Sequence, residues 1–228
     1  MIDLHMHSLF SDGELIPSEL ARRAAVAGYR AMAITDHVDD SNFDFILSRV
    51  SKVCSKISAA YGLFVLPGIE ITHVPPRWIP TLAKEARKAG AKIIVVHGET
   101  LVEPVIEGTN LAAVQSDIDI LAHPGLIDED SVRLAAKAGI CLEISTRKGH
   151  CLGNGHVAVM ARKHGAKMVI NTDTHSPGDL ASREFARRVA RGAGLSEAEM
   201  ARLFKNSEEI VRKVTAAREP VRRPRRKG

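Results

Sequence analysis

The sequence predicts an α/β protein in which parallel strands alternate with helices and close into a single barrel. Seven short aliphatic or β-branched runs recur along the chain, and each is followed by a segment with the apolar spacing of a helix. The connections are long enough for the helical crossovers that parallel strands require. The 228 residues, 45% of them apolar, show no break in composition before residue 217, so one sizeable core is expected.

The seven predicted strands cover residues 2–7, 31–35, 64–71, 92–97, 118–123, 140–145 and 167–172. In the first strand, apolar residues alternate with Asp3, His5 and His7, as they do in a strand with two different faces. The helices between the strands have recognisable ends. Pro17 opens one helix, and Gly90 closes another that covers residues 78–89.

Three amphipathic segments near the C-terminus, 180–193, 196–204 and 206–217, predict helices that pack outside the barrel and do not form a second domain. Seven β/α units favour a closed or nearly closed barrel, and an open doubly wound sheet is the alternative. Open sheets of that kind usually carry a glycine-rich phosphate loop. Neither G-x-G-x-x-G nor G-x-x-x-x-G-K-[ST] occurs in this sequence.

The net charge of +5 is confined to the C-terminus. Residues 218–228 hold six of the 32 basic side chains and one of the 27 acidic ones, so residues 1–217 are neutral. With two prolines and no aromatic residue, this basic tail is expected to be a solvated, disordered end that follows a single domain formed by residues 1–217. The functional alternative is a weak electrostatic contact with nucleic acid or another polyanion.

Composition also narrows the location and the kinds of site. No apolar run approaches the roughly 18 to 20 residues of a membrane span, and Met1 leads straight into a strand-like pattern. We therefore expect a cytoplasmic protein without a membrane contact. Cys54, Cys141 and Cys151 are odd in number and lack C-x-x-C spacing, which argues against a disulfide framework and against a thiolate zinc site. The oligomeric state stays open.

Most of the histidines lie where a parallel barrel binds its ligands. Six of the ten are at or just past the C-terminal end of a predicted strand: His5, His7, His37, His97, His123 and His175. Period two puts His5 and His7 on the same face of the first strand. Asp173 and His175 repeat that spacing at the last strand, which closure of the barrel brings beside the first.

Two carboxylates extend this set. Asp12 lies in the turn after His7, and Glu70 lies at the end of the third strand. Nitrogen and oxygen ligands without thiolates suit zinc, manganese or iron. Their number exceeds the three or four that one catalytic zinc takes from a protein, so two or more ions are expected, with the oxygens of Glu70 divided between them.

These residues belong to motifs that resemble a known family. The motifs are His5-Met-His7-Ser8 with Ser11-Asp-Gly13, Thr35-Asp-His37, Gly68-Ile-Glu70, His97-Gly-Glu99, Ala122-His-Pro124 and Thr172-Asp-Thr-His175. In this order they look like the motifs of the PHP (polymerase and histidinol phosphatase) superfamily. The resemblance covers residues 5–175 and is greatest to small stand-alone members of the histidinol-phosphatase type.

The resemblance implies a distorted seven-stranded (β/α) TIM-like barrel, two to three divalent ions and hydrolysis of phosphate esters. Carried over by motif, His5, His7, Glu70 and Asp173 would bind one ion, Glu70, His97 and His123 a second, and Asp12, His37 and His175 a third. The expected reaction is attack on phosphorus by a water or hydroxide that bridges two ions and has its pKa lowered by them. No protein nucleophile is needed.

The loop after the sixth predicted strand carries two candidate substrate groups. Arg147 is placed to clamp a phosphate with its two-pronged guanidinium, and His150 to bind the phosphate or to protonate the leaving oxygen. The alternative for both is an exposed loop pair. Glu99 is expected either to orient a metal ligand, since it lies two residues beyond His97, or to be a surface carboxylate.

The predicted substrate is a small phosphorylated metabolite with a phosphate monoester. One alternative is a phosphodiesterase or 5′ to 3′ exonuclease acting on oligonucleotides, which the basic tail would suit. A second is amide or ring hydrolysis, whose sites on similar barrels often use a modified lysine at a strand end, where this chain has His97. A third is a non-catalytic nucleic-acid-binding module, against which the complete set of motif residues argues.

Overall fold

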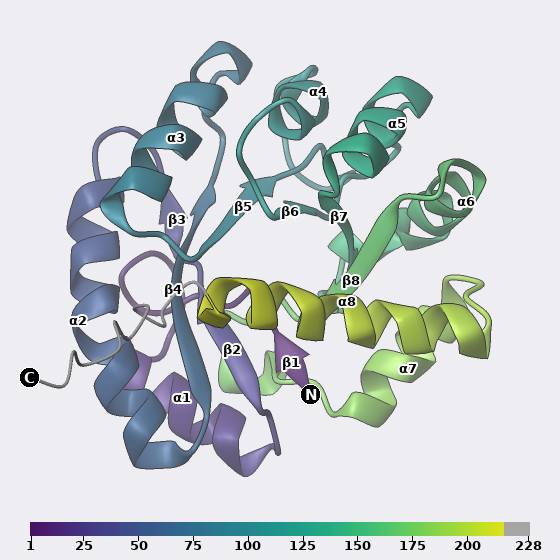
Figure 1. Cartoon of the computed structure of the whole chain (residues 1–228). Coiled ribbons are helices and arrows are strands. Elements are labelled where there is room, and N and C mark those ends of the chain that lie inside the picture. The colour runs from purple at the N-terminus through teal and green to yellow at the C-terminus, as the bar shows by residue number, and fades with distance from the viewer. Residues whose placement is uncertain (217–228) are drawn as a thin grey trace, which may run out of the picture.

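The computed structural model describes residues 1–216 and shows a ring of parallel strands surrounded by helices (Figure 1). The strands are β1 (Ile2–Asp3), β2 (Ala31–Ile34), β3 (His37–Val38), β4 (Phe64–Ile71), β5 (Ile93–His97), β6 (Ile120–Ala122), β7 (Cys141–Ser145) and β8 (Lys167–Asn171). Seven of them pair in the order β1-β2-β4-β5-β6-β7-β8, and the short β3 pairs with β4 beside this path. The predicted distorted seven-stranded barrel is confirmed.

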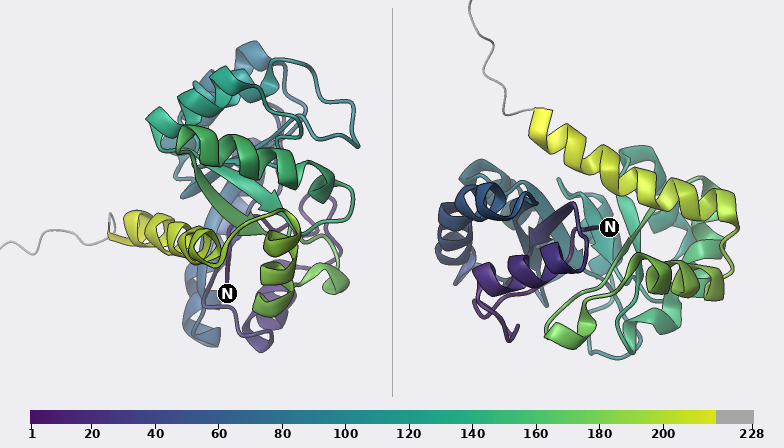
Figure 2. Two further views of the ribbon diagram at one scale, coloured as in Figure 1. Left: turned by 90° about the vertical axis from the view of Figure 1, so that its right-hand side faces the viewer. Right: turned by 90° about the horizontal axis from the view of Figure 1, so that it is seen from below.

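Most of the helices lie in the connections between strands and cover the outside of the barrel, and the last two follow the last strand (Figures 1 and 2). They are α1 (Pro17–Val26), α2 (Phe43–Tyr61), α3 (Ile79–Ala89), α4 (Thr109–Val114), α5 (Glu129–Ala138), α6 (Asn154–His164), α7 (Arg183–Gly192) and α8 (Glu197–Ala216). Three single turns of 3-10 helix are η1 (Pro76–Trp78), η2 (His150–Gly153) and η3 (Pro177–Asp179). The expected ends are present, with Pro17 in the first turn of α1 and Gly90 in the left-handed conformation after α3.

The C-terminal helices differ from the prediction. The two helices predicted over 196–204 and 206–217 are, within the described residues, one continuous helix, α8 (Glu197–Ala216), because no residue around Lys205 breaks the helical pattern. The helix predicted over 180–193 begins only at Arg183, where the side chain of Ser182 accepts a hydrogen bond from the Phe185 amide and caps the first turn. The basic tail predicted for residues 218–228 lies outside the described residues, and the domain boundary at 217 stays a prediction.

Side chains, more than backbone pairing, close the barrel between β1 and β8. The amide of Leu4 donates to Oδ1 of Asn171 at 2.9 Å, and the Thr172 hydroxyl donates to Oδ2 of Asp3 at 2.6 Å. Backbone contact resumes further along, where the His7 amide donates to the Thr174 carbonyl at 2.8 Å. The predicted strand 2–7 is therefore interrupted after Asp3, and this seam is the distortion of the barrel.

Two apolar clusters hold the fold together. The larger lies between the strands and the surrounding helices, and the smaller contains Leu4, Leu66, Val95 and Val169 together with Val211 of α8. Helix α8 crosses one end of the barrel in front of β1 and β8 (Figure 1) and packs on both strands. Since its contacts are at the start of the strands, the opposite end, where the strands finish, is left for the polar residues.

Candidate metal centre

Glu70 is the centre of a buried group of imidazoles and carboxylates. It lies on β4, and its side chain is fully buried. Its Oε1 is 3.2 Å from Nε2 of His5 and 3.8 Å from Nε2 of His123, while its Oε2 is 2.7 Å from Nδ1 of His37 and 3.7 Å from Nε2 of His7. The two oxygens therefore face different pairs of histidines, as expected of a carboxylate that binds two ions, one through each oxygen.

Asp173 supplies a second buried carboxylate to this group. It follows β8, and its Oδ1 is 3.1 Å from Nε2 of His7 and 3.6 Å from Nε2 of His5, with Oδ2 at 3.7 Å from Nε2 of His123. Its backbone has φ 52°, in the left-handed region, and His123 has φ 27°. Non-glycine residues seldom adopt these conformations, which cost free energy and gather at functional sites.

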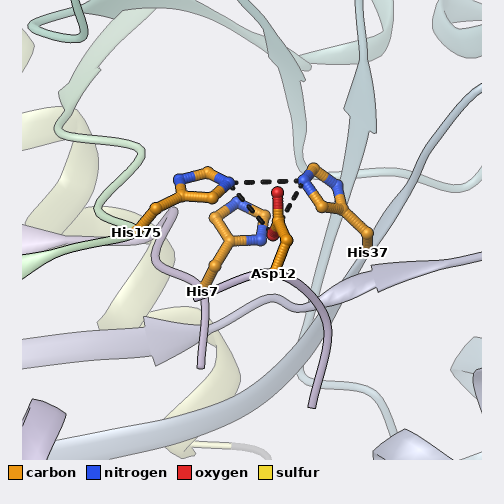
Figure 3. A group of neighbouring side chains, drawn as sticks. All are labelled: His7, Asp12, His37 and His175. Atoms are coloured by element: carbon orange, nitrogen blue, oxygen red, sulfur yellow. Dashed lines mark hydrogen bonds and ion pairs between the residues drawn. The ribbon is translucent and has the colours of Figure 1, made fainter. Parts of the chain in front are cut away.

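A second group lies nearer the solvent and contains His7, Asp12, His37 and His175 (Figure 3). The Oδ1 atom of Asp12 is 3.2 Å from Nε2 of His175 and 3.4 Å from Nε2 of His37. The rings of His7 and His175 stack with their centroids 4.1 Å apart. Three stretches far apart in the sequence, 7–12, His37 and His175, thus place potential ligand atoms within 4.8 Å of one another.

A third group joins His97 and His123 to His150, whose ring stacks on that of His123 with centroids 4.1 Å apart. The His150 Nδ1 atom lies 2.7 Å from the Thr100 hydroxyl, so Nε2 is the nitrogen left to face the cavity. Burial lowers the pKa of His150 to about 4. His150, expected on a loop, lies instead in the short turn η2 and is largely buried among the other histidines.

The buried donor atoms are more numerous than their hydrogen-bond partners. Both ring nitrogens of His7 and His123, Nε2 of His5, Oε1 of Glu70 and Oδ1 of Asp173 have no hydrogen-bond partner among the described residues. Burial holds the pKa of His7 and His123 well below its usual range, which favours neutral rings with a free lone pair. Unpaired buried polar atoms are costly, and divalent cations would satisfy them, so this donor set fits metal ions.

Electrostatics separate the two carboxylates at the centre. Burial raises the pKa of Asp173 to about 7. Burial acts in the same direction on Glu70, but the rings of His5 and His37 outweigh it and hold the pKa of Glu70 well below its usual range. Glu70 is therefore ionised at neutral pH, as a carboxylate that holds cations must be.

A cavity of about 430 Å³ lies over the histidines and carboxylates, and Arg147 is one of the residues that line it. Its Nη1 donates to the Asp173 carbonyl at 3.0 Å and lies 3.6 Å from Oδ2 of Asp179, and its Nε lies 3.5 Å from Oδ2 of Asp173. About a quarter of the side chain is exposed, at 28%. The guanidinium is thus held in place by protein oxygens and still faces the space where a substrate would lie.

The structure also contains residues near the centre that the sequence analysis did not single out. Glu143, on β7, accepts a hydrogen bond at 2.9 Å from Nδ1 of His5, and the Thr72 hydroxyl lies 2.7 Å from Nδ1 of His37. Glu103 lies 3.1 Å from Nε2 of His97. Of these residues, only Glu143 could have been identified from the sequence, because an acidic residue in an otherwise apolar strand needs a buried partner. The sequence suggests Glu99 as a residue that orients a metal ligand, but its Oε1 accepts a hydrogen bond from the Asn110 amide at 2.8 Å and not from a histidine.

Comparison with known proteins places this site in a family. Residues 3–176 match the PHP domain family, a stretch that contains every predicted metal ligand together with Arg147 and His150. The chain belongs to the PHP family. An uncharacterized protein of Methanocaldococcus jannaschii is 46% identical over 93% of this chain and 99% of its own length. A probable phosphatase of Thermoanaerobacter is 26% identical over 86% of this chain and 88% of that protein.

Among solved structures, a chain from the cryo-EM structure of archaeal ribonuclease P with mature tRNA has a similar fold, with a TM-score of 0.75. That match has 18% identity and covers 97% of this PHP protein and 94% of that chain. At this identity it shows the fold alone. No helix within residues 1–216 is both long and apolar enough to cross a membrane.

Proposed function

We propose that this PHP protein is a metal-dependent phosphatase that hydrolyses the phosphate monoester of a small metabolite, with two to three divalent ions of zinc, manganese or iron. The observation that carries the proposal is the convergence of imidazoles and carboxylates on the two buried oxygens of Glu70. Membership of the PHP family and the similarity to a probable phosphatase support phosphoric-ester hydrolysis.

The ligand assignment is the one that the family motifs imply, and the groups of neighbouring residues agree with it in part. Asp12, His37 and His175 are neighbours, as are His5, His7 and Glu70, whereas His97 and His123 are grouped with His150. We assign one ion to His5, His7, Glu70 and Asp173, a second to Glu70, His97 and His123, and a third to Asp12, His37 and His175. Ions bound at these positions would supply Lewis acidity toward the phosphate and lower the pKa of a water molecule enough for it to attack phosphorus.

The other residues of the cavity complete the proposed reaction. Arg147 binds a phosphate oxygen through Nη2, the guanidinium nitrogen that its contacts to Asp173 and Asp179 leave free, and those contacts orient the guanidinium in advance. His150 presents Nε2 to the cavity, where it can bind a phosphate oxygen or carry a proton to the leaving oxygen. Burial of the centre limits access of bulk water to the reacting groups.

Metal analysis combined with a phosphatase assay tests this function. Purified protein is expected to contain about two to three transition-metal ions per chain, as multi-ion centres do. His7→Ala should remove turnover of p-nitrophenyl phosphate and of phosphorylated metabolites, including histidinol phosphate. Unchanged turnover in that variant would exclude the role given to His7.

The anchoring role of Arg147 has a separate signature. Arg147→Ala should raise KM for phosphate monoesters, because a phosphate anchor acts in ground-state binding. Arg147→Lys is the matched variant, since it keeps the charge and loses the planar guanidinium that the contacts to Asp173 and Asp179 hold in place. An unchanged KM in Arg147→Ala would remove the residue from the substrate site.

Nucleic acid is the second candidate substrate, and the likeness of the fold to a chain of archaeal ribonuclease P favours testing it. A dinucleotide compared with a phosphomonoester, in the full chain and after deletion of residues 218–228, separates the two. Preference for the dinucleotide that depends on the tail would indicate a phosphodiesterase or exonuclease. Salt-dependent nucleic-acid binding without hydrolysis of any ester would indicate a binding module.

A further inference from the structure

His73 and Glu103 form a pair at the mouth of the cavity that the ligand assignment leaves unused. His73 follows β4, and Glu103 lies on the loop between β5 and α4. The Nε2 atom of His73 is 3.3 Å from Oε2 of Glu103, and the same oxygen is 3.1 Å from Nε2 of His97. The side chains of His73 and Glu103 are 44% and 36% exposed, whereas that of His97 is 3% exposed.

This arrangement has the donor set of a zinc site. Two imidazole nitrogens and one carboxylate oxygen, with a fourth position open to solvent, are typical protein ligands of a catalytic zinc ion. The Nδ1 atom of His97 lies 3.1 Å from the Gly98 carbonyl, to which it can donate, so the lone pair is on Nε2, toward Glu103. His73 has φ 53°, a costly backbone conformation that brings its ring against His97 with centroids 5.2 Å apart.

His97 is the residue common to this mouth group and to the inner group with His123 and His150. The inner ligands are buried beside the cavity, whose lining includes His73, His97 and Glu103, so an ion that enters through the cavity meets these side chains. Because Nε2 of His97 binds one ion at a time, an ion held at the mouth competes with the inner position for the same nitrogen. Occupation of the two positions is therefore sequential.

We propose that His73, His97 and Glu103 form a capture site for a divalent transition cation such as zinc, from which the ion passes inward by way of His97. The inference rests on the multi-ion centre of the proposed function. It assigns His73 and Glu103 to ion loading, while turnover of the loaded enzyme does not require them.

Exchange of zinc isotopes in the loaded protein tests the proposal. Zinc-loaded protein is mixed with an excess of a stable zinc isotope, desalted at intervals and analysed by mass spectrometry. Glu103→Gln and His73→Asn should each slow exchange about tenfold, the scale expected when a metal site loses a supporting group, with the total zinc per chain unchanged. Asparagine is chosen at 73 because it tolerates the left-handed conformation. Glu107→Gln, on the same loop and exposed, is the matched control and should exchange at the wild-type rate.

Two results would overturn the capture site. Exchange at the wild-type rate in both variants would show that His73 and Glu103 form only a surface ion pair. Loss of a bound ion at equilibrium in Glu103→Gln would make Glu103 a permanent ligand. Neither readout uses turnover, so a zinc-loaded protein that hydrolyses no ester but shows slowed exchange would refute the proposed function and leave the capture site intact.

Discussion

The contact between Glu143 and His5 offers the sharpest test of how the barrel prepares its metal ligands. Both side chains are fully buried, with Oε2 of Glu143 2.9 Å from Nδ1 of His5. The Asn171 side-chain amide donates to the same oxygen at 2.9 Å and ties β8 to β7. The hydrogen bond fixes the His5 tautomer with its lone pair on Nε2, which faces Glu70 at 3.2 Å.

Glu143→Gln keeps the shape of the side chain and removes its charge. Loss of a carboxylate that supports a ligating histidine typically weakens metal binding ten- to a hundredfold, which corresponds to about 1.4 to 2.7 kcal/mol. We expect the ion held by His5 to be lost at roughly ten- to a hundredfold lower concentration of chelator. The ion assigned to Asp12, His37 and His175 should be retained as in the wild type, because Glu143 contacts none of these residues.

Dialysis against graded EDTA followed by metal analysis measures this difference. Circular dichroism and Tm show whether the variant is folded. Glu99→Gln is the matched control, because Glu99 accepts the Asn110 amide and has no contact with a histidine ring among the described residues. If Glu143→Gln retains its ions at the same chelator concentrations as the wild type, the orienting role of Glu143 is refuted.

Three further predictions concern stability. Gly125 has φ 57°, and a Cβ there would lie 2.0 Å from the Glu99 carbonyl oxygen. Gly125→Ala should therefore lower Tm more than Gly139→Ala, because Gly139 is also left-handed but a Cβ there would have no atom within 4 Å. Equal shifts in Tm would contradict the clash. Asp128→Ala removes the carboxylate that accepts the Ser131 amide at 2.9 Å and should cost ~1 kcal/mol in the free energy of unfolding measured with denaturant, while Asp130→Ala should be nearly neutral. Removal of bound metal by EDTA should lower Tm, because ions that bind only the folded chain stabilise it, and an unchanged Tm would count against resident ions.

Local patterns in the sequence predict most of the framework of this protein. The strand over 64–71 has the predicted bounds, and the strand ends near His97, Ser145 and Asn171 agree within one residue. The errors lie where local pattern and tertiary context disagree. The strand over 2–7 is interrupted because the side chain of Asn171 accepts from the Leu4 amide and that of Asp3 from Thr172, in place of backbone pairing. The strand β3 exists only because His37 and Val38 pair with the last two residues of β4.

The candidate site shows the same division. The i, i+2 spacing of His5 with His7 and of Asp173 with His175 could be read from the sequence, and the structure brings all four together with Asp12, His37, Glu70, His97 and His123. Glu103 and His73 could not be predicted, since each lies on a loop without a periodic pattern. Their position depends on how the loops after β4 and β5 fold over the cavity.

The sequence by itself determined the alternation of strands and helices, the chemical class of the ligands and their place at the strand ends, because these depend on periods of two and 3.6 residues and on residue type. Only the tertiary structure decided which carboxylate supports which imidazole, where Arg147 is held and which residues meet at the mouth of the cavity. Such contacts join residues far apart in the sequence, 138 positions in the case of His5 and Glu143, and depend on barrel closure to place their atoms within hydrogen-bond distance.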